Sequence, residues 1–197
     1  MKRTLSAILA LILTLALSAA ASAEAYTHPE AGYGFAVPEG WIVLNSATVD
    51  TLLDFGAQAI ESEVDLSAML EQVKSLPMTV LFKTLDSTNN INVLPQDLGM
   101  PATVSDLLPL AGMFEAQYQA VFADYVTSIP LTEAMIGDWE VAIMGGEYTL
   151  MGMDLSLRQV LLMSGTIMYT FSLTVESDEM EEFELVLMEL VASFVAP

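Results

Sequence analysis

The two residue types that most often act as catalytic base or thiol nucleophile, histidine and cysteine, are almost absent from this sequence. His28 is the only histidine and cysteine is absent, so a Ser-His-Asp arrangement has one candidate base and a Cys-His pair cannot form. His28 precedes Pro29 in the N-terminal part of the chain, where chain ends are commonly mobile. We therefore expect His28 to be an exposed structural residue, and we assign no catalytic residue.

The residue types also give little support to metal binding. Zinc sites of the usual kind need several His or Cys ligands, which this chain cannot supply. The two densest acidic clusters, residues 61–65 and 178–182, lack the Asp-x-Asp-x-Asp-Gly turn of an EF-hand. The thioethers of Met151-Gly152-Met153 are suited to Cu(I), but methionine is also a common filler of hydrophobic cores. We therefore predict no bound metal or cofactor, and calcium in particular is not expected.

The remaining unusual residues are interpreted as structural. Gly145-Gly146 lacks the lysine and the strand–loop–helix context of a phosphate-binding loop, and it is interpreted as a β-bulge or a strand break. Trp41 and Trp139 are interpreted as core anchors rather than ligand platforms. The 26 acidic residues are too numerous for a pair of hydrolytic carboxylates to be singled out without geometry.

The first 23 residues have the features of an export signal. Lys2 and Arg3 precede the apolar run 5–17, and Ala21-Ser22-Ala23 has the small-x-small pattern of a signal-peptidase site. The run is shorter than the roughly 20 apolar residues of a membrane-spanning helix, although retention as an N-terminal anchor is the alternative. We expect residues 1–23 to be removed. A single domain, residues 24–197, would then be exported without a stable membrane span to the bacterial cell envelope or extracellular space, where chains without cysteine are common.

The expected mature chain is strongly acidic. Without the signal, three basic residues (Lys74, Lys83 and Arg158) remain against 26 acidic ones, a net charge of −23. Phosphate backbones and anionic lipid surfaces both attract clustered Lys and Arg, so nucleic acid is excluded as a partner and anionic membrane surfaces are disfavoured. The acidic residues are spread along the chain, which is typical of a solvated protein surface.

Alternating apolar residues predict an antiparallel sheet. Strands are predicted in residues 26–44, in the apolar hairpin 78–85 and 91–94, and in residues 126–175, of which 166–175 alternate cleanly. Pro38-Glu39-Gly40 is a predicted turn in the first segment, and Ser164-Gly165 is a predicted turn in the last. Consecutive hairpins favour antiparallel pairing, and helices must cover the apolar faces of such a sheet.

Helical periodicity predicts the elements that cover the sheet. Residues 48–75 and 105–125 have helical patterns, with Ser105 as the expected N-cap of the second. A last helix follows Ser177, its expected N-cap. Its apolar stripe consists of Met180, Phe183, Leu187, Leu190 and Phe194. The fold class is therefore α+β.

Two segments resemble the ends of PsbP-like domains. Residues 34–41, GFAVPEGW, resemble the opening motif of that family, and residues 169–174 with the acidic helix ending in Ser193-Phe194 resemble its close. The resemblance implies an α/β/α sandwich, in which a central antiparallel sheet is covered by helices on both faces. The family includes the photosystem II extrinsic protein, DcrB-type bacterial envelope proteins and a nuclear Ran-binding factor, which are mostly accessory or binding proteins. The metal- and partner-binding residues of the photosystem protein have no counterparts here, so none is carried over.

We therefore favour a non-enzymatic accessory or binding protein that docks to another protein of the cell envelope. The alternatives are a carrier or sensor of a small apolar or metal ligand and, third, a carboxylate-dependent hydrolase. Leu185 and Met188 fall off the apolar stripe of the last helix, close to Glu181, Glu184 and Glu189. We expect these residues to form a partner surface that binds an envelope protein with complementary positive charge.

Overall fold

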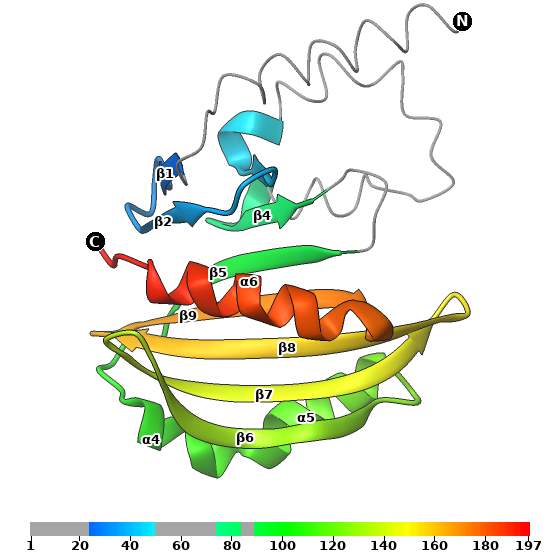
Figure 1. Cartoon of the computed structure of the whole chain (residues 1–197). Coiled ribbons are helices and arrows are strands. Elements are labelled where there is room, and N and C mark those ends of the chain that lie inside the picture. Colours follow the sequence, from blue (N-terminus) through cyan, green and yellow to red (C-terminus); the bar gives the residue numbers. More distant parts are fainter. Residues whose placement is uncertain (1–23, 50–73, 84–88) are drawn as a thin grey trace, which may run out of the picture.

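The computed structural model describes residues 24–49, 74–83 and 89–197 (Figure 1). Its main element is a seven-stranded sheet in which all neighbouring strands are antiparallel, as predicted. From one edge to the other, the strands are β3 (Ile42–Leu44), β4 (Thr79–Phe82), β5 (Asn90–Asp97), β9 (Ile167–Glu176), β8 (Met153–Ser164), β7 (Trp139–Leu150) and β6 (Val126–Ile136). A second, two-stranded sheet pairs β1 (Glu24–Thr27) with β2 (Gly34–Val37).

Strands β6 to β9 form a continuous meander. Its turns contain residues that adopt the positive φ values that tight turns require. Met151 and Gly152 in the β7–β8 turn have φ values of 52° and 80°, a two-residue geometry that matches the twist of the flanking strands. Gly165, with φ of 64°, lies in the β8–β9 turn, so the turn predicted at Ser164-Gly165 is confirmed. Beyond this turn the predicted alternation is also confirmed, because Tyr169, Phe171, Leu173 and Val175 are all buried.

Gly145-Gly146 lies within β7, which continues without interruption from Trp139 to Leu150. Of the two predicted alternatives, the strand break is therefore wrong, whereas a bulge-type shift of register does occur here. It lies on the partner strand β6, between Thr127 and Ile129, which pair with Gly146 and Gly145. A Cβ at Gly145 would overlap the guanidinium of Arg158, and a Cβ at Gly146 would overlap the ring of Tyr125. The two glycines leave room for large side chains on opposite faces of the sheet.

Helix α6 (Met180–Ala192) covers one face of the sheet after the 3-10 turn η2 (Ser177–Glu179). Its predicted apolar stripe is confirmed: Phe183, Leu187, Leu190 and Phe194 are buried, and Met180 is half-buried against the same core. The predicted cap is wrong, because the chain first makes the 3-10 turn and Glu179 becomes the N-cap residue. The hydroxyl of Ser177 instead accepts a hydrogen bond from Ser156 at 2.9 Å.

The single helix predicted for residues 105–125 is divided into α4 (Val104–Leu107), the 3-10 turn η1 (Leu108–Leu110) and α5 (Ala111–Val121). Pro109 explains the division, since proline lacks the N–H that a continuous α-helix needs at this point. Thr103, not Ser105, is the N-cap of α4. The N–H and hydroxyl of Thr103 donate to the carboxylate of Asp106 at 2.8 and 2.7 Å.

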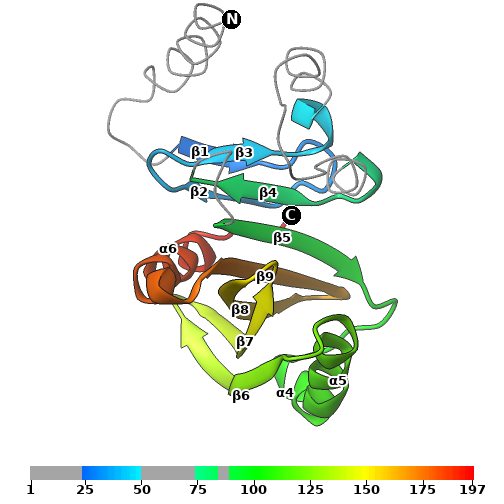
Figure 2. The same cartoon turned by 90° about the vertical axis from the view of Figure 1, so that its right-hand side faces the viewer.

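Helices α4 and α5 lie next to β6, β7 and β8, away from α6 (Figure 2). Val104 and Leu107 of α4 share an apolar cluster with Ala142 and Leu161. The helix predicted for residues 48–75 falls mostly outside the described residues, so these show a large antiparallel sheet with a few helices rather than a complete α/β/α sandwich. Within the described ranges, no helix is long and apolar enough to cross a membrane.

Candidate functional site

His28 is buried, so the prediction of an exposed histidine is wrong. Only 1% of its surface is exposed, and its ring stacks on that of Tyr33 with 5.0 Å between the centroids. Nδ1 accepts hydrogen bonds from the backbone N–H groups of Glu30 at 3.2 Å and Ala31 at 3.0 Å. These bonds close the turn between β1 and β2, and the pairing of the two strands places the ring against the core.

We expect the free energy of unfolding to fall as the pH drops below about 6.5, the usual pKa of histidine. Burial lowers the pKa of His28, and the nearby carboxylate of Glu30 opposes this shift only in part. The unfolded chain therefore takes up a proton that the folded chain does not. The stability contribution is complete above the usual pKa and is lost as the pH falls toward the lowered one. Urea unfolding at about pH 7.5 and about pH 5.5, on either side of that usual value, measures the loss.

The variant His28→Asn is the matched control for this pH dependence. Its side-chain oxygen is able to accept the N–H groups of the turn but does not titrate. The wild type should lose more stability than the variant over the same pH interval, because the carboxylates are common to both chains. An equal loss in the two chains would show that His28 is not the responsible group.

The described part of the chain contains no group of three or more His, Cys, Asp or Glu residues that could hold a metal ion. One of the two acidic clusters, residues 61–65, lies outside this part. In the other, residues 178–182, Glu182 pairs with Lys83 at 3.0 Å and Glu179 accepts a hydrogen bond from Asn89. The second cluster is thus engaged with the neighbouring sheet.

The two methionines of segment 151–153 lie in different surroundings. Met151 is exposed in the β7–β8 turn, whereas Met153 packs against a buried cluster on β8. Trp139 is a core anchor, as predicted, and its Nε1 donates to the carbonyl of Phe194 at 3.0 Å. Trp41 also packs against the core, but part of it lines a pocket.

The residues predicted as a partner surface lie on two sides of α6. Three of them are exposed: Glu181, Leu185 and Glu189. Met188 is half-buried against the core, and Glu184 turns toward Arg158, with 2.7 Å between its Oε1 and Nε. Leu185, which is 66% exposed, is thus the only exposed apolar residue of the predicted partner surface, and it lies between Glu181 and Glu189. A single exposed leucine is ordinary on a protein surface.

A broader apolar surface lies on α5 and on the last residue of η1 before it, a surface that the sequence analysis does not single out. Leu110, Met113 and Val121 are 39%, 56% and 69% exposed, and their helical spacing places them on one side of this segment. Residues 107–123 contain a single charged residue, Glu115. We define the α5 face as Leu110, Met113, Gln117 and Val121. The sequence feature that could have revealed this surface is the scarcity of charged residues in one segment of a very acidic chain.

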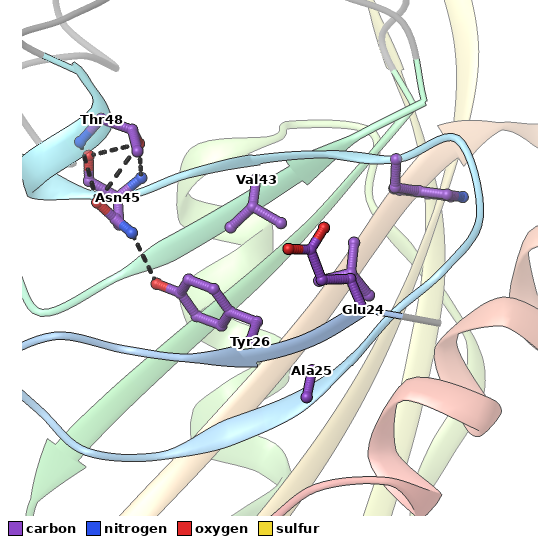
Figure 3. A pocket seen from close by; sticks show the side chains of 8 residues that line it. Glu24, Ala25, Tyr26, Val43, Asn45 and Thr48 are labelled. Atoms are coloured by element: carbon purple, nitrogen blue, oxygen red, sulfur yellow. Dashed lines mark hydrogen bonds between the residues drawn. The ribbon is translucent and has the colours of Figure 1, made fainter. Parts of the chain in front are cut away.

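A small pocket forms where β1, β2 and β3 meet (Figure 3). Its volume is about 280 Å³, and its walls include Ala25, Tyr26, Val37, Trp41 and Val43. Asn45 and Thr48 form a polar end, and Glu24 is the one charged residue of the lining. The carboxylate of Glu24 is directed into the space beside Tyr26 and Val43 (Figure 3).

Hydrogen bonds hold the polar end of this pocket in place. Nδ2 of Asn45 donates to the hydroxyl of Tyr26 at 2.9 Å, and that hydroxyl bonds the hydroxyl of Thr79 at 3.0 Å. Thr79 in turn bonds the buried hydroxyl of Tyr33 at 2.7 Å. Burial keeps the pKa of Tyr33 above its usual value, so its hydroxyl stays protonated within this network. Because the Tyr26 hydroxyl is already bonded, its ring is the part available to a ligand.

Glu24 has no ion-pair partner within residues 24–49, 74–83 and 89–197. Lys83 and Arg158 instead pair with Glu182 and Glu184 of α6. The pocket therefore combines aromatic and aliphatic walls with one unpaired carboxylate. Sequence reasoning missed it because its lining comes from three strands and the segments that join them.

The arrangement of strands is that of the PsbP-like fold, which three solved structures share. Cyanobacterial PsbP (CyanoP) from Synechocystis aligns with a TM-score of 0.55 and 14% identity, over 90% of this chain and 94% of its own. LpqN from Mycobacterium tuberculosis, involved in cell envelope biogenesis, aligns with a TM-score of 0.52 and 13% identity, over 88% of this chain and 90% of its own. The PsbP-like fold that the sequence resemblance implies is therefore confirmed, whereas a complete α/β/α sandwich, with helices on both faces of the sheet, is not.

A structure from Bacteroides thetaiotaomicron aligns over 90% of this chain, with a TM-score of 0.53 and 13% identity. This chain spans about half of that protein, 49% of its length. Neither protein-family profiles nor curated protein sequences give a match to this chain. Identities this low show a common fold and nothing finer.

Proposed function

We propose that this chain is a non-enzymatic accessory protein of the cell envelope or the extracellular space that acts by binding another protein. The observation that carries the proposal is the α5 face, an exposed apolar surface in a segment with one charge, in a chain with 26 acidic and five basic residues. Exposed apolar side chains along one face of a helix are typical of protein contact surfaces. The involvement of LpqN in cell envelope biogenesis and the export-signal pattern of residues 1–23 support the location.

The partner that fits this surface is a protein with an apolar contact area bordered by basic residues. Apolar side chains would meet the α5 face, and basic residues would be attracted by the acidic exterior around it. This attraction is screened over about 8–10 Å near physiological ionic strength, so binding should weaken as salt is added. We retain Leu185 with Glu181 and Glu189, together with the half-buried Met188 and the paired Glu184, as a second and smaller candidate surface.

The double variant Met113→Lys/Val121→Lys should lose its partner. Both side chains are exposed, so the substitutions should change folding stability by less than about 0.5 kcal/mol each while placing charge in the apolar contact. We expect a loss of at least about tenfold in affinity, the size that central contact residues contribute. The measurement is crosslinking and capture from native envelope extract, followed by titration with the purified partner.

Leu185→Lys is the matched control, because it introduces the same charge at an equally exposed position on the other helix. Retained binding in this control and lost binding in the α5 variant would support the α5 face. Loss only in the control would place the contact on α6. Binding of the purified partner that survives both substitutions would contradict the proposal.

A second candidate function, the carrier or sensor of a small ligand, is favoured by the pocket at β1, β2 and β3. The pocket lies away from the α5 face, since β3 is at the opposite edge of the seven-stranded sheet from β6. The two functions are therefore separable by substitution.

A further inference from the structure

We propose that the pocket formed by Glu24, Tyr26, Trp41 and Asn45 binds a small organic cation, an alkylammonium or guanidinium group on a short apolar stem. This inference goes beyond the protein-binding role, because it concerns a different part of the molecule. It is based on the charge, the aromatic walls and the size of the pocket.

The charge of the pocket selects a cation. Glu24 is the one charged group of the lining, and it has no ion-pair partner within the described residues. The whole chain has a net charge of −21, which concentrates cations near its surface and repels anions. An anionic ligand would therefore meet repulsion both from the pocket and from its surroundings.

The walls of the pocket suit an organic cation rather than a metal ion. Trp41 and Tyr26 contribute aromatic surface, which attracts ammonium and guanidinium groups. Val37 and Val43 add aliphatic surface for an apolar stem. A divalent metal ion would find one carboxylate there, whereas calcium usually takes six to eight oxygen ligands.

The size and the polar end of the pocket restrict the ligand further. Pockets for drug-sized ligands begin at about 300 Å³, so a volume of about 280 Å³ suits a group of a few carbon atoms. A neutral apolar ligand of that size would cover the Glu24 carboxylate without replacing its lost hydration. Because Asn45 is held by Tyr26 and caps the backbone of Thr48, the pocket is preorganised.

The experiment compares three probes of similar size: n-butylammonium, n-butanol and butyrate. Binding is followed by tryptophan fluorescence in the full chain, and Trp41→Phe identifies the part of the signal that comes from the pocket. We expect butylammonium to bind and butyrate not to bind. Butanol should bind at least about threefold more weakly than butylammonium, because an exposed carboxylate such as Glu24 and a cation–π contact each favour a cation by a modest amount.

Glu24→Gln tests the carboxylate, and Glu30→Gln is the matched control on the same β-hairpin. The first substitution should weaken butylammonium binding by about three- to fivefold, and the control should leave it unchanged. Equal affinity for butylammonium and butanol would overturn the proposal. It would equally be overturned if the two glutamine variants behaved alike, or if saturating butylammonium produced no Trp41 signal.

Two further arms of the same titration identify the source of the cation. If Nα-acetyl-lysine methylamide binds as tightly as butylammonium, the source is a lysine side chain of another protein. If it does not bind, the source is a free amine. A chain cut before Glu24 would carry its own α-ammonium beside the pocket. Repeating the titration at about pH 9 neutralises most of that group, whose usual pKa is about 8, while butylammonium stays charged. None of these variants touches the α5 face, so failure here is distinguishable from failure of the protein-binding proposal.

Discussion

Phe194→Ala should lower the free energy of unfolding by about 3–5 kcal/mol, the usual range for removing a fully buried phenylalanine ring. Phe194 is buried just after α6, where four aromatic rings surround it. The distances between ring centroids are 4.7 Å to Tyr169, 5.2 Å to Phe171, 5.9 Å to Trp139 and 6.1 Å to Tyr33. The ring thus joins β7 and β9 to the start of β2, and its removal leaves a cavity that these elements cannot all close.

Val195→Ala is the matched control, because the next residue is an exposed apolar side chain whose backbone pairs with Gly34. Its removal should cost less than about 0.5 kcal/mol. Urea unfolding followed by circular dichroism gives both values. Similar losses in the two variants would show that the C-terminal segment does not pack as described, and Phe183→Ala, also buried on α6, should behave like Phe194→Ala.

Glu184→Ala should lower the free energy of unfolding by about 2–4 kcal/mol, because it leaves the buried guanidinium of Arg158 without its counter-charge. Nε of Arg158 lies 2.7 Å from Oε1 of Glu184, and the Arg158 side chain is 9% exposed. Nη1 of Arg158 is buried without a hydrogen-bond partner. The ion pair with Glu184 is therefore the main interaction that offsets the desolvation of the guanidinium. The expected loss is at the lower part of the range for buried pairs because Glu184 remains 32% exposed.

Glu182→Ala provides the matched control on the same helix. Glu182 also pairs with a cation, Lys83 at 3.0 Å, but both side chains are largely exposed, so its loss should cost less than about 0.5 kcal/mol. The double variant Arg158→Met/Glu184→Met should recover much of the stability lost in Glu184→Ala, because no buried charge remains unpaired. Equal effects of Glu184→Ala and Glu182→Ala in urea unfolding would contradict the burial of this pair.

Local patterns were sufficient for most of the secondary structure. The alternation in residues 167–175 and the stripe from Met180 to Phe194 each predicted the face that is buried, because strand and helix periods depend only on neighbouring residues. The helix boundaries were less well predicted. Thr103 replaced Ser105 as the N-cap of α4, since both residue types are competent caps and packing selects between them. At α6 the 3-10 turn displaces the start of the helix, so Glu179 occupies the N-cap position without a side-chain cap bond.

The sequence by itself determined the class of the protein: an acidic α+β chain without cysteine, with a single histidine and the motifs of a PsbP-like fold. These properties depend on composition and on short-range order along the chain. Only the tertiary structure decided that His28 is buried, that Gly145 and Gly146 make room for Arg158 and Tyr125, and that Glu184 faces inward. Each of these outcomes depends on contact between segments far apart in the chain, and so does the pocket, whose lining comes from three strands.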